Sequence, residues 1–218
     1  MRVRIGEGLR YVVRHPYLRA LFATSMIVNF FGRMLQVAVL VFMVRQAHLS
    51  AAWIGIAFSL GTIGFVVGAA LAERVIERLG LGRAIVGGSL LTIPSFLLVA
   101  VTPRHLAVPF VAGWLLLYGF GAMMFNIGHA TFRQATTPRE ILGRVNATLR
   151  FVSWGAVPIG TLLGGLLGSA FGLRAAMWVA AAGGLFGPLP LMLSGVRSLQ
   201  TLPEPADQAG REAGAPLA

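Results

Sequence analysis

The sequence predicts an all-α, polytopic membrane protein, because its composition and the spacing of its apolar stretches suit lipid better than water. Of its 218 residues, 56% are hydrophobic and 11% are charged, and the mean hydropathy is +0.78. Soluble domains carry about 25% charged residues. Charges and Pro or Gly breaks separate six apolar stretches, each long enough to cross a hydrocarbon core of about 30 Å as a helix. They cover residues 18–44, 53–72, 84–101, 106–127, 151–171 and 175–196.

Taken in order, these stretches form one predicted six-span bundle over residues 18–196 and leave no segment for a soluble catalytic domain. Before them, residues 1–17 place aliphatic side chains opposite arginines at helical spacing, which predicts a cytoplasmic amphipathic helix that ends before Pro16. The first stretch is longer than the apolar region of about 7–15 residues in a secretory signal, so we expect it to remain as a span. Residues 197–218 are rich in Pro, Gly and Ala and predict a disordered cytoplasmic tail.

The basic residues indicate orientation rather than nucleic-acid binding, although the net charge is +11. Of the 18 arginines, 14 fall in alternate connections or at the two ends, and three fall in the opposite connections. By the positive-inside rule, both termini face the cytoplasm. We expect a multi-pass protein of the bacterial inner (plasma) membrane. The 14 are Arg2, Arg4, Arg10, Arg14, Arg19, Arg74, Arg78, Arg83, Arg133, Arg139, Arg144, Arg150, Arg197 and Arg211, and the three are Arg45, Arg104 and Arg174.

Small residues at four-residue spacing predict close contacts between helices. The fifth span carries Ala156, Gly160, Gly164, Gly168 and Gly172, and the second carries Ala57, Gly61, Gly64, Gly68 and Ala72. Such grooves let another backbone approach closely. They are either ordinary packing surfaces or surfaces on which helices slide during transport. Proline should also kink the fifth span, and the Gly and Pro residues at 183–190 should loosen the sixth.

A polar stripe on the first span is the clearest candidate site. Ser25, Asn29, Arg33 and Gln36 lie within about 80° of one another at 100° per residue, while the rest of that helix is apolar. A guanidinium near mid-membrane costs at least about 2.5 kcal/mol, so it should face protein or water. Either Arg33 reaches the interface or caps a neighbouring carbonyl, or the stripe lines a solute route where Arg33 binds an anionic or hydrogen-bonding substrate.

The fourth and fifth spans offer a second candidate surface, formed by Tyr118, Asn126 and Trp154 together with Ala122, Phe125, His129 and Ser153. Aromatic residues at this spacing serve either in packing or in ligand contact. An aromatic and amide lining suits a bulky amphipathic solute better than a small ion.

Several catalytic signatures are missing from the sequence. No carboxylate lies within a predicted span, and there is no P-loop, HExxH or GxSxG motif and no cysteine. We therefore expect no catalytic residues, no metal site and no cofactor, and any acid that couples transport to protons must come from outside these spans.

Two cytoplasmic connections carry a resemblance. The first contains Glu77-Arg78-Leu-Gly80-Leu-Gly82-Arg83, and it resembles the acid-Arg-x-Gly-basic loop of the major facilitator superfamily, with Glu77 in the usual Asp place. The second contains Thr137-Pro138-Arg139-Glu140 and Gly143-Arg144, and its capping box predicts a short helix that begins there. The resemblance implies that these loops gate the protein through charge pairs. The gating residues would be Glu77, Arg78, Gly80, Arg83, Arg139, Glu140, Gly143 and Arg144.

With the opening segment around residues 7–16, these loops are similar to the C-terminal half of the enterobactin and macrolide exporter branch. Members of the superfamily have twelve spans in two halves. The resemblance therefore implies half of a secondary transporter that exports an amphipathic siderophore or drug-like molecule by alternating access. Its partner would be a missing N-terminal half or a second copy in a parallel homodimer, in contact with membrane lipid. The alternative is a non-transporting remnant or regulatory membrane subunit.

Overall fold

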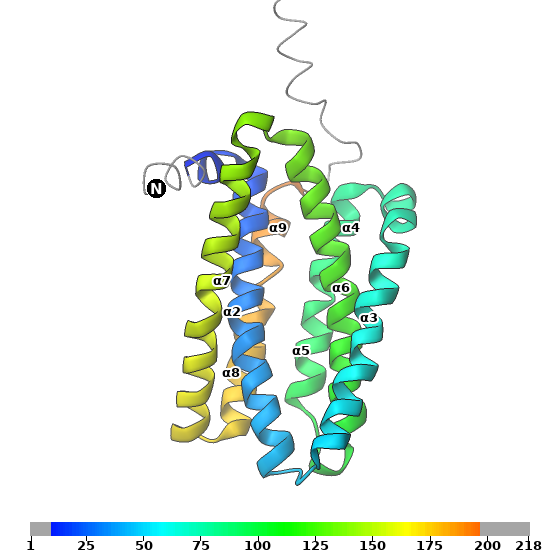
Figure 1. The fold of residues 1–218 in the computed structure, drawn as a ribbon, viewed down its shortest axis with the longest axis vertical. Helices are drawn as coiled ribbons and strands as arrows, with labels where there is room; N and C mark the ends of the chain where they lie inside the picture. The colour runs from blue at the N-terminus through cyan, green and yellow to red at the C-terminus, as the bar shows by residue number, and fades with distance from the viewer. Residues whose placement is uncertain (1–9, 197–218) are drawn as a thin grey trace, which may run out of the picture.

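The computed structural model describes residues 10–196, without the side chains of residues 139 and 152, and over this range the secondary structure is helical. Within residues 10–196, six helices or helix pairs are long and apolar enough to cross a membrane, which confirms the predicted fold class (Figure 1). They are α2 (Pro16–Arg45), α3 (Ala51–Leu79), α4 (Leu81–Leu90) with α5 (Thr92–Ala100), η1 (Arg104–Leu106) with α6 (Ala107–Thr136), α7 (Arg139–Ala170), and α8 (Leu173–Leu185) with α9 (Leu189–Leu193). The predictions for residues 1–9 and for the tail, residues 197–218, lie outside the described residues.

Two spans are interrupted where the sequence supplies helix breakers. The third span has a turn at Leu91, three residues before Pro94, whose ring cannot fit against the preceding helical turn. The sixth has a turn over residues 186–188 between α8 and α9, as the Gly and Pro residues there predicted. Pro158 lies inside α7.

A helix begins at the predicted place, directly after Pro138, but the prediction that it is short is wrong. Pro138 is the N-cap of α7, which continues for 32 residues through the connection and the fifth span, and no side chain caps its first turn. Its first turns are polar, but charged side chains at a helix end can remain in water while the backbone hydrogen bonds continue. The polar segment and the apolar span therefore form one helix.

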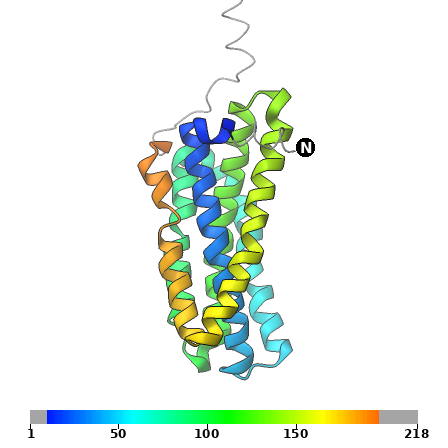
Figure 2. The same cartoon turned by 90° about the vertical axis from the view of Figure 1, so that its left-hand side faces the viewer.

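The spans pack as two groups (Figure 1). In one group α2 contacts α7, α8 and α9, and in the other α6 contacts α3, α4 and α5, while α5 joins the groups by packing on α8. Figure 2 shows α2 lying between α7 and the α8–α9 pair. Away from their charged ends, α3 and α7 expose large apolar side chains, including Ile63, Val66, Leu162 and Leu166, as expected of surfaces that face lipid.

Glycine allows the closest contacts in both groups. The buried residues of α3 are the five small residues of its predicted stripe. A Cβ at Gly68 would lie 2.9 Å from the Phe120 carbonyl oxygen on α6. On α7, a Cβ at Gly160 would lie 2.5 Å from the carbonyl oxygen of Phe30 on α2. Both stripes are therefore sites of backbone-to-backbone packing.

The fifth-span stripe is shorter than predicted. Gly172 does not line the groove but forms the turn between α7 and α8, with a φ of +88° that an L side chain rarely adopts. No atom lies within 4 Å of a Cβ built at this glycine. Helical spacing continued to residue 172 in the sequence, although the helix itself ends at Ala170.

The segment before α2 docks onto the end of the bundle. Residues 10–14 are helical and His15 bends the chain before Pro16. The Tyr11 hydroxyl donates to the Thr136 carbonyl oxygen (2.9 Å), and His15 Nδ1 accepts a hydrogen bond from the Leu18 amide (3.4 Å). Burial lowers the pKa of His15, so the neutral ring keeps its acceptor nitrogen.

Arg174 connects the two groups at the opposite end of the bundle. Its guanidinium donates to the carbonyl oxygens of Ala100 (3.2 Å) and Thr102, and it lies 4.7 Å from the centre of the Phe42 ring. We expect Arg174→Gln to lower the free energy of unfolding by about 2 kcal/mol, because two charge-assisted hydrogen bonds and a cation–π contact are lost. Thermal unfolding of purified protein in detergent measures this change.

Arg104→Gln is the matched control for Arg174, because Arg104 is exposed at the same end of the bundle. Its removal should change stability by less than about 0.5 kcal/mol. Equal losses from the two variants would contradict a specific role for the Arg174 contacts.

Candidate functional site

Among the described residues, three cavities line the space between the two groups of spans. The largest, about 680 Å³, lies between α2, α6 and α7 and is called the inner cavity here. A second of about 350 Å³, the outer cavity, lies between α2, α3 and α6, and a small one of about 80 Å³ lies beside them. Asn29 on α2 and Asn126 on α6 line all three. This pair of amides therefore marks where the cavities meet.

The structure brings the predicted stripe of α2 onto these cavities. Ser25 and Asn29 line the inner cavity, and Asn29, Arg33 and Gln36 line the outer one. Arg33 Nη1 donates to the Gln36 side-chain oxygen (2.8 Å), so its partner is a side chain of the same stripe rather than a neighbouring carbonyl. The Asn29 amide donates to the Ser25 carbonyl oxygen (2.8 Å).

The residues of the second predicted surface also line the cavities, but they are divided between the inner and the outer cavity. Tyr118 and Asn126 line the outer cavity, where the Tyr118 ring centre lies 6.2 Å from that of Phe65 and 6.5 Å from that of Trp114. Trp154 lines the inner cavity although its side chain is 75% exposed. The outer cavity is therefore aromatic on one side and polar on the other.

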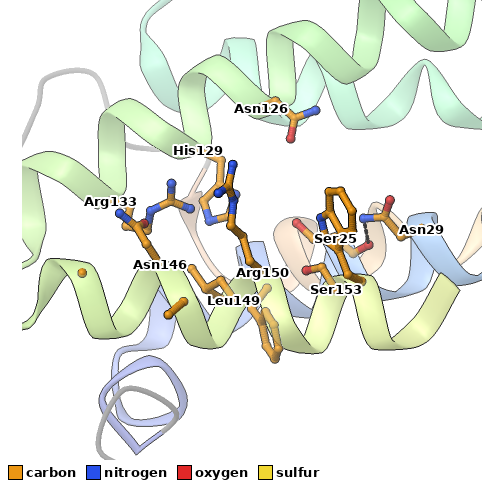
Figure 3. A pocket seen from close by; sticks show the side chains of 13 residues that line it. Ser25, Asn29, Asn126, His129, Arg133, Asn146, Leu149, Arg150 and Ser153 are labelled. Atoms are coloured by element: carbon orange, nitrogen blue, oxygen red, sulfur yellow. Dashed lines mark hydrogen bonds between the residues drawn. The ribbon is translucent and has the colours of Figure 1, made fainter. Parts of the chain in front are cut away.

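Sequence reasoning missed three polar residues of the inner cavity: Arg133, Asn146 and Arg150. The sequence placed them in a cytoplasmic connection. α6 and α7 instead run on past the apolar stretches and carry these side chains to the cavity (Figure 3). A signal was present, because Arg133 follows Asn126 and His129 at spacings of seven and four, and Arg150 follows Asn146 by four.

The predicted gating residues lie at the ends of α3, α4 and α7 and mostly away from the cavities. Gly80 adopts a φ of 85° in the sharp turn between α3 and α4. Glu77, Arg78 and Arg83 are exposed beside it, and among the described residues the structure gives them no ion pair. Their gating role stays a prediction.

The second gating group lies at the start of α7. Gly143 lines the inner cavity, Glu140 and Arg144 are exposed, and the side chain of Arg139 lies outside the described part of the structure. A gating role for this group also stays a prediction.

The side chains that line the cavities are suited to binding a solute. The lining of the inner cavity contains no carboxylate, and the described residues contain no group of three potential metal-ligating side chains. The cavities offer amide, hydroxyl and guanidinium groups beside aromatic rings. This combination suits a solute that carries both polar and apolar parts.

Comparisons with known proteins give the family. The chain is 28% identical to the multidrug efflux pump Tap of Mycolicibacterium fortuitum over 196 residues, which cover 88% of this chain and 44% of the pump. Its fold is similar to that of a mutant of the peptide transporter POT in complex with alafosfalin, with a TM-score of 0.61 and 20% identity over 89% of this chain and 42% of that one. The chain thus spans less than half the length of either relative. The family model described as Major Facilitator Superfamily matches residues 22–217, and the chain belongs to that superfamily.

Proposed function

We propose that the chain is half of a secondary active transporter that exports an amphipathic small molecule by alternating access. The observation that carries this proposal is the set of cavities between the α2 and α6 groups, which pair a polar stripe with aromatic side chains. Transporters of this superfamily hold substrate between two six-span halves. The relatives named an efflux pump and a peptide transporter support transport as the activity.

A second six-span bundle is needed to close the site. Arg33 and Asn126 line the cavities and yet are exposed in this chain, so a lone copy would present polar groups to lipid. The second bundle is either an N-terminal half or another copy in a parallel homodimer. The arginine bias supports a bacterial inner-membrane protein with both termini on the cytoplasmic side. The loop motifs favour the siderophore and macrolide exporter branch.

Export assays test this proposal. Inverted membrane vesicles would contain the chain alone, or the chain with a six-span partner encoded beside it, and uptake of fluorescent amphipathic dyes would be followed. We expect energised uptake, and we expect Arg33→Ala to reduce it by about tenfold or more, because the outer cavity then loses its cation and the Gln36 contact. Arg74→Ala is the matched control, since Arg74 is exposed on α3 and lines none of the three cavities.

The rival function is that of a remnant or regulatory subunit. A remnant would give no energised dye uptake with any partner. A regulatory subunit would alter dye uptake by a complete transporter, and that effect would not need Arg33. Uptake that is absent in every combination, or that is equally reduced by Arg74→Ala, would count against the proposal.

A further inference from the structure

We propose that the inner cavity is an anion-binding site, in which Arg133 and Arg150 hold the phosphate or carboxylate group of an amphipathic ligand. This inference rests on the proposed function, because it assigns the class of ligand taken by the same cavities. It rests on residues other than the α2 stripe.

Four side chains from two facing helices converge there. His129 and Arg133 lie one turn apart on α6, and Asn146 and Arg150 lie one turn apart on α7. Figure 3 shows these side chains directed into the space between the two helices. All four can present N–H donors, and two of them are permanent cations.

The polar atoms at this place lack partners. His129 is 8% exposed and its Nε2 has no hydrogen-bond partner in the described structure. The same holds for the buried Nε of Arg133 and the buried Oδ1 of Asn146, whose amide can be turned to present its donors. A buried polar group without a partner is destabilising, and several in one cavity indicate that a ligand supplies the partners.

The charges of the lining residues indicate that the ligand is an anion. Arg133 and Arg150 line the same cavity, where two like charges repel one another, and no carboxylate of the described residues lines the cavity or forms an ion pair with either guanidinium. An anion between them would offset the repulsion, and a phosphate or carboxylate oxygen pair matches the planar guanidinium in a bidentate geometry.

The remainder of the ligand would be apolar. The inner cavity meets the outer one at Asn29 and Asn126, and beyond them lie the rings of Phe58, Phe65 and Tyr118. An anionic head at the arginines thus leaves an apolar or aromatic body within reach of these rings. Such a ligand is either a soluble organic anion or an anionic phospholipid that enters from the bilayer.

Binding of naphthyl phosphate to the purified chain in nanodiscs, measured by calorimetry, tests the site. Naphthol has the same ring without the charge, and inorganic phosphate has the charge without the ring. We expect naphthyl phosphate to bind more tightly than either. Arg133→Gln and Arg150→Gln should each weaken its binding by about tenfold or more, because each removes a charge-assisted contact. Arg74→Gln, which removes an exposed charge outside the cavity, should leave binding within about twofold.

The lipid composition of the nanodiscs distinguishes the two sources. Weaker binding in phosphatidylglycerol than in phosphatidylcholine nanodiscs supports a lipid headgroup as the occupant, and equal binding supports a soluble anion.

Because Arg150 is exposed, Arg150→Gln should fold even if Arg133→Gln does not. Equal binding of naphthol and naphthyl phosphate, unchanged binding by Arg150→Gln, or an equal loss in Arg74→Gln would overturn the proposal. Dye uptake in the vesicle assay without such binding would leave the transport proposal standing and remove only this one.

Discussion

Substituting leucine for Gly64 is expected to abolish the contact between α3 and α6 and to leave little folded protein. A Cβ at this position would lie 2.6 Å from the Cα of Leu116, and the neighbouring carbonyl oxygen is nearer still. These are backbone atoms of a packed helix, so they cannot rotate away as a side chain would. Overpacking a core by a few methyl groups costs about 1–3 kcal/mol, and a leucine against backbone should exceed that range.

The measurement is the yield of monodisperse protein in size-exclusion chromatography, together with its thermal unfolding midpoint. Gly55→Leu is the matched control on the same helix, because Gly55 is exposed and no atom lies within 4 Å of a Cβ built there. It should retain or slightly raise stability, since glycine within a helix costs about 1 kcal/mol relative to better helix formers. Similar loss in both variants would show that α3 tolerates no larger residue anywhere, and the specific contact at Gly64 would be refuted.

The contact at Gly64 illustrates what the sequence can predict for this chain. Lipid requires long apolar helices, and close packing between them requires small residues, so both features leave periodic patterns. The five small residues of α3 were predicted as one surface, and they are its buried residues. The helix that covers this surface could not be predicted, because a small-residue stripe carries no information about its partner.

The inner cavity illustrates the opposite case. Arg133 and Arg150 contribute to the arginine bias that predicts orientation, and the same charges line the cavity. Hydropathy places the end of a span where apolar residues stop, at residue 127 for the fourth stretch, but α6 continues to Thr136. Helix length depends on backbone hydrogen bonds and tertiary packing as well as on apolarity. Side chains in the added turns therefore reach the cavity without changing the apolar pattern.

Single cysteines along α2 are expected to label with a water-soluble maleimide only on the face that lines the cavities. The chain has no native cysteine, so each variant has a clean background. We expect complete labelling at Ser25, Asn29 and Gln36, because each lines a cavity between the two groups of spans. Leu35 and Val39, which are 0% exposed, should stay unlabelled as matched positions on the same helix.

The side from which each position labels carries further information. In the proposed orientation, a cysteine at Ser25 should react from the cytoplasmic side in tests on intact cells and inverted vesicles, because the inner cavity lies toward the arginine-rich helix ends. A cysteine at Gln36 should react from the opposite side, with Asn29 between them where the cavities meet. An added substrate that protects one set of positions and exposes the other is the result expected of alternating access. Labelling that is absent along the whole helix, or equal at Leu35 and Gln36, would show that α2 does not border a hydrated route.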